Sequence, residues 1–228
     1  MLETASIPVA RIAWRAAHRI VPSRFPPVGL WDRIARPEDF DALAEIEGLT
    51  NPRIREELGI LAQIPRARWV TGPGTTPIMA AFTHLNPEGS RFCDGSYGVL
   101  YVSAAVETAI RETVFHRERF LRRTREPPIQ LQMRGYVTAV RRALHDVRGA
   151  YPALHRPDDY AESQRVGRAL RAGGSDGVVY DSVRHRGGHC AAVFWPDCVA
   201  PFRQSRHYAY EWDGTAITSV VELKSVRL

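Results

Sequence analysis

The segment GVLYVSAAVETAIRETVFH, residues 98–116, contains the two elements around which the rest of the chain is organised. Its first part, Val99 to Ser103, combines apolar and aromatic residues in the manner of a β-strand. The part that follows, Ala104 to about Arg123, consists of good helix formers, and Ser103 stands where a helix N-cap residue would stand. The segment therefore predicts a strand that leads directly into a long helix, with Tyr101 near the start of that helix.

Outside this segment, strands and helices are interleaved without the regular alternation of a parallel sheet. We expect further strands at 131–140, 177–180 and 191–195, a C-terminal hairpin that turns at Asp213-Gly214, and a helix from Asp158 or Asp159 to Ala172. Roughly the first ninety residues predict mostly helix and loop, with helices near 37–47 and 50–58, an apolar segment at 77–84 and a short β-like stretch at 69–71. The pattern favours an α+β fold, with a mixed, partly antiparallel sheet flanked by helices.

The composition is that of an ordinary globular protein. The chain has 228 residues, of which 44% are hydrophobic and 25% charged, so it can bury a core without disulfides or a structural metal. No apolar run approaches the ~20 residues of a membrane-spanning helix. Arginines interrupt the N-terminal apolar stretches before a secretory signal can form. We therefore expect a cytoplasmic protein whose cysteines, Cys93, Cys190 and Cys198, are reduced and buried.

The chain is basic, with a net charge of +6 and an isoelectric point of about 9.6. Lys224 is its only lysine, so nearly all of the positive charge is arginine. Planar guanidinium groups suit phosphates and carboxylates, which is compatible with a nucleotide, a nucleic acid or an acidic protein as partner. A strong G+C bias in the genome would also replace lysine with arginine, and it explains the composition equally well.

The central helix carries a candidate site, because Thr108, Glu112 and His116 are spaced at i, i+4 and i+8 and share one face. A carboxylate beside a histidine can act as a general base or stabilise a developing cation. A solvated Glu–His pair gives the same spacing, so the spacing alone does not separate the two interpretations. The glycine-rich loop 89–98 favours a site, since Arg91 there can bring a guanidinium and backbone N–H groups to one anion.

A second candidate segment spans residues 176–190, where a buried strand ends near Ser182 and a loop of cations and glycines follows. Such a loop can receive a diphosphate, although a basic exposed turn has the same composition. The glycines form neither a Walker loop nor a dinucleotide fingerprint. Cysteines and histidines lack the spacing of a metal site, so we expect no metal.

Taken together, these segments resemble the RES-domain family, and most closely its ParT-type ADP-ribosylating members. Members of this family are toxins of two-gene toxin–antitoxin modules, in which the partner is an Xre-like antitoxin. The resemblance is carried by HRIVP (18–22), GSRF (89–92), GVLYVS (98–103), ETAIRETVFH (107–116) and DGVVYDSVR (176–184). The central block is the most specific of these. The family is named after an arginine, a glutamate and a serine, which correspond to Arg91, Glu112 and Ser182.

The resemblance implies a fold like that of diphtheria-toxin-type ADP-ribosyltransferases and an enzyme that consumes NAD⁺ as substrate, with no prosthetic group. The enzyme would cleave the nicotinamide–ribose bond and transfer ADP-ribose to a protein target, water or phosphate. Glu112 would stabilise the cationic ribose, with Arg91 and His116 also catalytic. The implied NAD⁺-binding residues are Arg19, Tyr101, Ser103, Thr108, Ser182 and Arg184. Tyr101 would stack on nicotinamide and Ser182 would contact the diphosphate.

The resemblance also suggests how the chain is divided. We expect one domain over residues 1–228, in which 31–86 is a helical insertion or extension and 87–228 is the core with most of the NAD⁺ site. Arg15 is the alternative to Arg19 as the first site arginine. The implied partners are NAD⁺, an Xre-like antitoxin that blocks the active site, and a target protein if one is modified.

Two other classes of function remain open at this stage. In a basic nucleic-acid-binding or RNA-cleaving protein, the arginine-rich run 117–125 would contact the nucleic acid, although Glu118 interrupts that run. A non-catalytic interaction domain is the third class. Release of nicotinamide from NAD⁺ would mark the first class, and salt-sensitive nucleic-acid binding the second.

Overall fold

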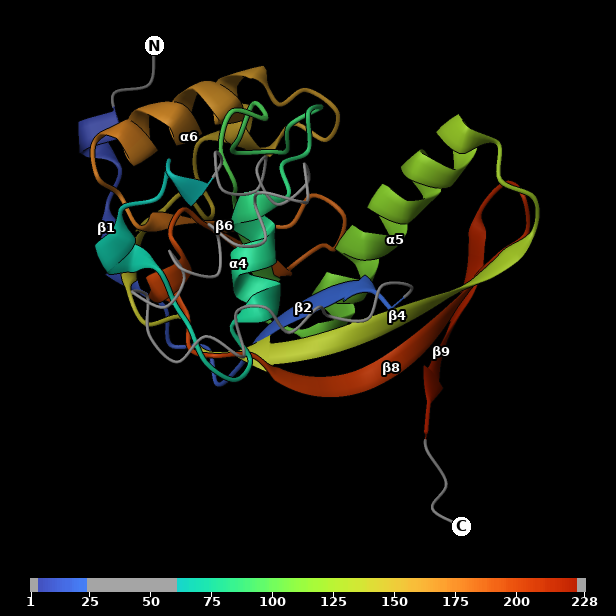
Figure 1. Cartoon of the computed structure of the whole chain (residues 1–228). Helices are drawn as coiled ribbons and strands as arrows, with labels where there is room; N and C mark the ends of the chain where they lie inside the picture. Colours follow the sequence, from blue (N-terminus) through green and yellow to red (C-terminus); the bar gives the residue numbers. More distant parts are fainter. Residues whose placement is uncertain (1–3, 24–60, 225–228) are drawn as a thin grey trace.

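The computed structural model describes residues 4–23 and 61–224 (Figure 1). Its strands form one sheet of nine, in the order β1-β5-β6-β7-β3-β2-β4-β8-β9. The strands are β1 (Val9–Arg11), β2 (Ala17–Pro22), β3 (Leu100–Ser103), β4 (Ile129–Thr138), β5 (Ala143–Asp146), β6 (Gly177–Asp181), β7 (His189–Val193), β8 (Arg203–Trp212) and β9 (Ile217–Leu223). Among these described strands, only β5 and β6 pair in parallel. This mixed, mainly antiparallel sheet with flanking helices confirms the α+β fold class.

The described helices divide between the two halves of the sheet. They are α4 (Thr76–Thr83), α5 (Val106–Thr124) and α6 (Ala161–Ala172), with 3₁₀ turns η1 (Thr4–Ser6), η2 (Arg66–Arg68), η3 (Pro152–His155) and η4 (Pro196–Cys198). Figure 1 shows α5 crossing β2, β4 and β8, well apart from α6. None of the described helices is long and apolar enough to cross a membrane.

Each half of the sheet has its own hydrophobic cluster. The larger cluster joins β3, β5, β6 and β7 to α4 and α6, through fully buried residues such as Phe82, Val166 and Val178. The smaller one joins α5 to β2, β4 and β8, through Ala109, Met133 and Tyr210. The larger cluster also includes Ala17 of β2 and Tyr136 of β4. Because apolar burial is the main stabilising term in folding, it therefore holds the two halves together as well as its own helices.

The two halves meet where β2 lies beside β3. These strands share a single residue pair, His18 with Ser103, whereas β2 pairs with β4 through six residues and β3 with β7 through four. Beyond His18, β2 and β3 are no longer paired and the sheet forks. Strand β3 continues on one side of the fork with β7, and β2 continues on the other side with β4.

The strand–helix unit forms as predicted, except at its junction. Helix α5 begins at Val106, after the cap residue Ala105, and no side chain caps it. The expectation that Ser103 is the N-cap is therefore wrong, because Ser103 is the last residue of β3 and is buried between the strands. Helix α5 ends at Thr124, where Arg125 adopts the left-handed conformation and its N–H reaches the carbonyls of Arg122 and Leu121.

Several other element predictions need correction. The early part of the chain contributes strands β1 and β2 where mostly helix and loop were expected, and β5 was not predicted at all. The β-like stretch 69–71 forms no strand, and its Trp69 instead donates its indole N–H to the Ile64 carbonyl at 2.9 Å. Helix α6 begins at Ala161 rather than at Asp158 or Asp159. The helices expected at 37–47 and 50–58 lie outside the described residues.

Other predictions are confirmed by the structure. The hairpin turn at Asp213-Gly214 links β8 to β9, and the Asp213 carboxylate accepts the N–H groups of Thr215 and Ala216. Residues 129–138 form the strand expected at 131–140. All three cysteines are free and buried.

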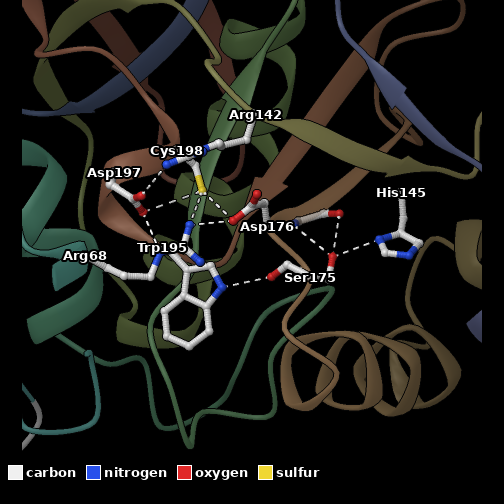
Figure 2. Close-up of polar contacts among 9 residues, drawn as sticks. Arg68, Arg142, His145, Ser175, Asp176, Trp195, Asp197 and Cys198 are labelled. Atoms are coloured by element: carbon white, nitrogen blue, oxygen red, sulfur yellow. Dashed lines mark hydrogen bonds and ion pairs between the residues drawn. The ribbon is translucent and has the colours of Figure 1, made fainter. Parts of the chain in front are cut away.

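An ionic network fastens the segment after residue 61 to the sheet (Figure 2). Arg68 donates to Asp197 at 2.7 Å, to Asp176 at 2.5 Å and to the Cys198 sulfur at 3.3 Å. Its guanidinium also lies 5.0 Å from the centre of the Trp195 ring. Burial, followed by the charge of Asp176, raises the pKa of the Cys198 thiol, so this sulfur stays protonated. The network ties η2 to the residues that flank β6 and β7.

Candidate active site

A cavity of about 720 Å³ opens at the fork of the sheet. It is lined by residues of β2, β3 and α5, by the loop 86–91, by the start of α6, and by Tyr180 of β6 and Cys190 of β7. Sites for small molecules and cofactors usually measure ~300–1,000 Å³ and lie where structural units meet. The cavity has the size of such a site.

Glu112 lies on the wall of this cavity, at the middle of α5. Its Oε1 accepts a hydrogen bond from the Ser182 hydroxyl at 2.6 Å. The thiol of Cys190 lies 3.9 Å from the same oxygen. Burial, followed by the negative charge of Glu112, raises the pKa of Cys190 to about 12, so the thiol is protonated at neutral pH. A hydroxyl and a thiol thus approach one oxygen of this carboxylate.

Ser182 is held from behind by its own loop. Its hydroxyl oxygen accepts the backbone N–H groups of Arg184 at 3.2 Å and His185 at 3.0 Å. The single hydroxyl proton is then left for Glu112. Ser182 is buried and does not line the cavity. The family resemblance implied a contact between Ser182 and the diphosphate, and in this structure the Ser182 hydroxyl donates to Glu112.

Thr108 and Arg184 also lie behind the cavity wall and do not line it. Thr108 is fully buried, and its hydroxyl lies 2.9 Å from Nδ1 of His185. Arg184 places its guanidinium 3.3 Å from the centre of the Phe115 ring and donates to the Pro157 carbonyl. Both residues therefore attach the 182–188 loop to its surroundings.

On the β3 side of the cavity stand Tyr101, Ser103 and Arg19. The Tyr101 hydroxyl accepts the Phe92 N–H at 3.0 Å and bonds the Ser90 hydroxyl at 2.8 Å, so it fixes the loop that carries Arg91. The buried Ser103 hydroxyl lies 3.5 Å from the Cys190 sulfur.

Arg19 is the early arginine that reaches the cavity. Its Nη1 donates to the Tyr101 carbonyl at 3.0 Å, while its buried Nε has no hydrogen-bond partner among the described residues. Burial lowers its pKa to about 10, which leaves it charged at neutral pH. Arg15, the alternative first site arginine, is exposed in the bend before β2 and does not line the cavity.

Arg91 is buried in the loop that the Tyr101 hydroxyl holds, and it also lines the cavity. Its Nη1 donates to the carbonyls of Leu154 at 3.1 Å and Arg156 at 2.9 Å. Its guanidinium also lies 4.6 Å from the centre of the Tyr160 ring. Arg91 therefore connects the glycine-rich loop to the segment before α6, and it brings its positive charge to the cavity surface.

His116 stands at the cavity mouth and is exposed. Desolvation of the imidazole by the neighbouring side chains, followed by the positive charges of Arg184 and Arg117, lowers its pKa to about 4. The imidazole is therefore neutral at pH 7. It can donate or accept a hydrogen bond there, but it adds no positive charge to the site.

Several cavity residues were not identified from the sequence. Tyr180 packs its ring edge-on against Phe92 at 5.0 Å and faces the cavity beside Cys190. Gln164 of α6 donates to the Ser90 carbonyl at 3.0 Å. Tyr180 lies within the DGVVYDSVR motif, where it is the last apolar residue of a buried strand, and this position was the available sequence signal.

Comparison with known proteins places the chain in a family. The RES domain family model matches residues 60–213, a range that includes Arg91, Glu112 and Ser182 but not Arg19. The chain is 37% identical over 203 residues to the uncharacterized protein y4oC of Sinorhizobium fredii (strain NBRC 101917 / NGR234), covering 88% of this chain and 84% of that protein. This chain belongs to the RES domain family.

A chain of the solved M. tuberculosis MbcT-MbcA toxin–antitoxin complex is also similar. It has a TM-score of 0.40 and 13% identity, over 56% of this chain and 74% of that chain.

Proposed function

We propose that this protein is the toxin of a toxin–antitoxin module and that it consumes NAD⁺ by cleaving the nicotinamide–ribose bond. The ADP-ribose would pass to a protein, water or phosphate. The observation that carries the proposal is the position of Glu112, whose carboxylate lies on the wall of a cavity of about 720 Å³ and is held at 2.6 Å by Ser182. Membership of the RES domain family supports the proposal.

The proposed chemistry needs a carboxylate at a defined place. When the bond between ribose C1′ and the pyridine nitrogen breaks, the electron pair leaves with nicotinamide and positive charge develops on the ribose. A carboxylate already oriented in the cavity stabilises that charge more than it stabilises the ground state. Ser182 acts as a positioning residue, because its hydrogen bond fixes one carboxylate oxygen without occupying the cavity surface.

The rest of the cavity suits the other parts of the substrate. Arg19 and Arg91 supply positive charge for the diphosphate, since guanidinium groups pair well with phosphate oxygens. Tyr101 and Tyr180 offer aromatic surface for nicotinamide. The neutral His116 and Ser103 add hydrogen-bonding groups. No prosthetic group enters this mechanism.

The family resemblance extends the proposal to a partner and a compartment. We propose an Xre-like antitoxin that covers the cavity mouth, and a cytoplasmic location where NAD⁺ is available. The nucleic-acid alternative has less support, because Glu118 and Glu88 pair with two arginines of the run 117–125, Arg122 and Arg123. Two others, Arg117 and Arg119, line the cavity.

Incubation of the purified protein with NAD⁺, followed by chromatography of the products, tests the proposal. We expect free nicotinamide from the wild type and at least a ~100-fold lower rate from Glu112→Gln, the loss typical of a removed electrostatic stabiliser. Glu107→Gln is the matched control, because Glu107 is exposed on the same helix and does not line the cavity. Circular dichroism checks that both variants fold. The proposal would be refuted if NAD⁺ stayed intact with wild type in the presence of added phosphate and of a cell lysate as a source of acceptor proteins, or if Glu112→Gln kept full activity.

A further inference from the structure

Helix α5 lines the cavity well beyond Glu112. Glu112, His116, Arg119 and Arg123 all face the cavity, at i, i+4, i+7 and i+11. With a rise of 1.5 Å per residue, Arg119 stands about 10 Å and Arg123 about 16 Å from Glu112 along the helix axis. A dinucleotide that places its nicotinamide ribose at Glu112 can therefore extend its adenosine half toward Arg119.

The cavity contains more positive charge than a diphosphate requires. Five arginines line it, namely Arg19, Arg91, Arg117, Arg119 and Arg123, against the carboxylates Glu88, Glu112 and Asp158. Glu88 pairs with Arg123, and Asp158 pairs with Arg184, which lies outside the lining. Within residues 4–23 and 61–224, the other four lining arginines have no carboxylate partner.

Two of these four cations have no part in the proposed NAD⁺ site. If Arg19 and Arg91 neutralise the two charges of the diphosphate, Arg117 and Arg119 remain. The guanidinium groups of Arg117 and Arg123 lie 5.7 Å and 5.8 Å, respectively, from the centre of the Phe120 ring. Burial lowers the pKa of Arg117, so this cation bears a desolvation cost that an anion in the cavity would offset.

We propose that the site accepts a 2′-phosphorylated dinucleotide, NADP⁺, with the 2′-phosphate of the adenosine ribose at Arg119 and Arg117. This inference rests on the proposed function and names its substrate more narrowly. A phosphate monoester carries a charge of about −1.5 to −2 at pH 7, which matches the two remaining arginines. The order of charge along α5 also matches the ligand: a carboxylate for the cationic ribose, a neutral histidine, and then arginines for the phosphorylated end.

Initial rates of nicotinamide release from NADP⁺ and NAD⁺, measured in phosphate-free buffer, test the inference. We expect kcat/KM to favour NADP⁺ by about tenfold or more, the effect of one charge-assisted contact. Arg119→Ala should lower the NADP⁺ value about tenfold and leave the NAD⁺ value within about threefold. Arg111→Ala is the control, because Arg111 is exposed on the same helix outside the cavity, and it should change neither value.

The outcomes separate this inference from the proposed function. Equal or faster cleavage of NAD⁺, or equal effects of Arg119→Ala on both substrates, would overturn the NADP⁺ assignment and leave the proposed function standing. Release from neither substrate in this buffer, and also none after addition of phosphate and of a cell lysate as a source of acceptor proteins, would remove the proposed function, and the inference with it. Calorimetry with Glu112→Gln gives a readout that needs no turnover. We expect 2′-phospho-ADP-ribose to bind about tenfold tighter than ADP-ribose, and equal affinities would count against the 2′-phosphate site.

Discussion

The hydrogen bond from Ser182 to Glu112 can be removed without changing the surface of the cavity. Ser182→Ala deletes a donor 2.6 Å from the carboxylate, on a residue that does not line the cavity. A hydrogen bond to a charged group contributes about 1.5–3 kcal/mol, which corresponds to a roughly 10- to 100-fold fall in kcat if the carboxylate must be held in place for the chemical step. KM should stay within about twofold, because the substrate does not touch Ser182.

The same substitution has a measurable cost in stability. The N–H groups of Arg184 and His185 lose their acceptor, the Ser182 hydroxyl oxygen. A fully buried unsatisfied donor costs about 1–3 kcal/mol. These two hydrogen bonds are only partly buried, so we expect the lower end of that range for each, and the urea midpoint should fall while the protein remains folded at 25 °C. Ser163→Ala is the matched control, since Ser163 is a fully buried serine of α6. Within the part of the chain that the structure describes, its hydroxyl makes one hydrogen bond, a long 3.5 Å contact with the Leu154 carbonyl.

The assay is the rate of nicotinamide release across a range of dinucleotide concentrations, for wild type, Ser182→Ala and Ser163→Ala. The control should keep wild-type kcat and KM. A folded Ser182→Ala with unchanged kcat would show that the hydrogen bond does not position the catalytic carboxylate. A large rise in KM with unchanged kcat would instead assign Ser182 to direct substrate contact, as the family resemblance first implied.

Two further predictions concern stability. Arg68→Met leaves Asp176 without its arginine and leaves Asp197 with Arg142 alone; these two carboxylate side chains are 25% and 21% exposed. The substitution should lower the free energy of unfolding by about 2 kcal/mol. Arg156→Ala, which breaks an exposed pair, should cost less than about 1 kcal/mol in the same urea titration. Folding lowers the pKa of the His116 imidazole from 6.5 to about 4. As the pH drops from 6.5 toward 4, His116 therefore becomes protonated in the unfolded chain before it does in the folded protein, and the free energy of unfolding falls. His116→Gln should lose less stability than wild type between pH 7 and pH 4.5, and an equal or larger loss would contradict the assigned shift.

The elements that the sequence predicted well are those with strong local signals. Helix α5 follows from a long run of good helix formers, and the β8–β9 hairpin from an Asp-Gly pair whose aspartate accepts N–H groups of its own turn. Strand β2 has no comparable signal. Its burial does not alternate, because it lies between the two hydrophobic clusters and pairs with β4, whose residues lie more than a hundred positions later. Its strand character comes from tertiary pairing that no local pattern encodes.

The candidate site shows the same limit at the level of single side chains. Glu112 was predicted from helical spacing and from its motif, but the residues that hold it lie far along the chain, with Ser182 70 positions away and the Thr108–His185 contact spanning 77. A polar residue at the end of a buried strand can face a ligand or support another side chain, and sequence does not choose between these roles.

For Ser182, hydrogen bonds from the backbone distinguish between these two roles. A serine hydroxyl that accepts the N–H groups two and three residues ahead forms a local turn motif, which fixes both its lone pairs. One proton then remains, and the fold directs it at Glu112. The turn that ends β6 therefore determines the orientation of a carboxylate on α5, and this coupling can be read only from the folded chain.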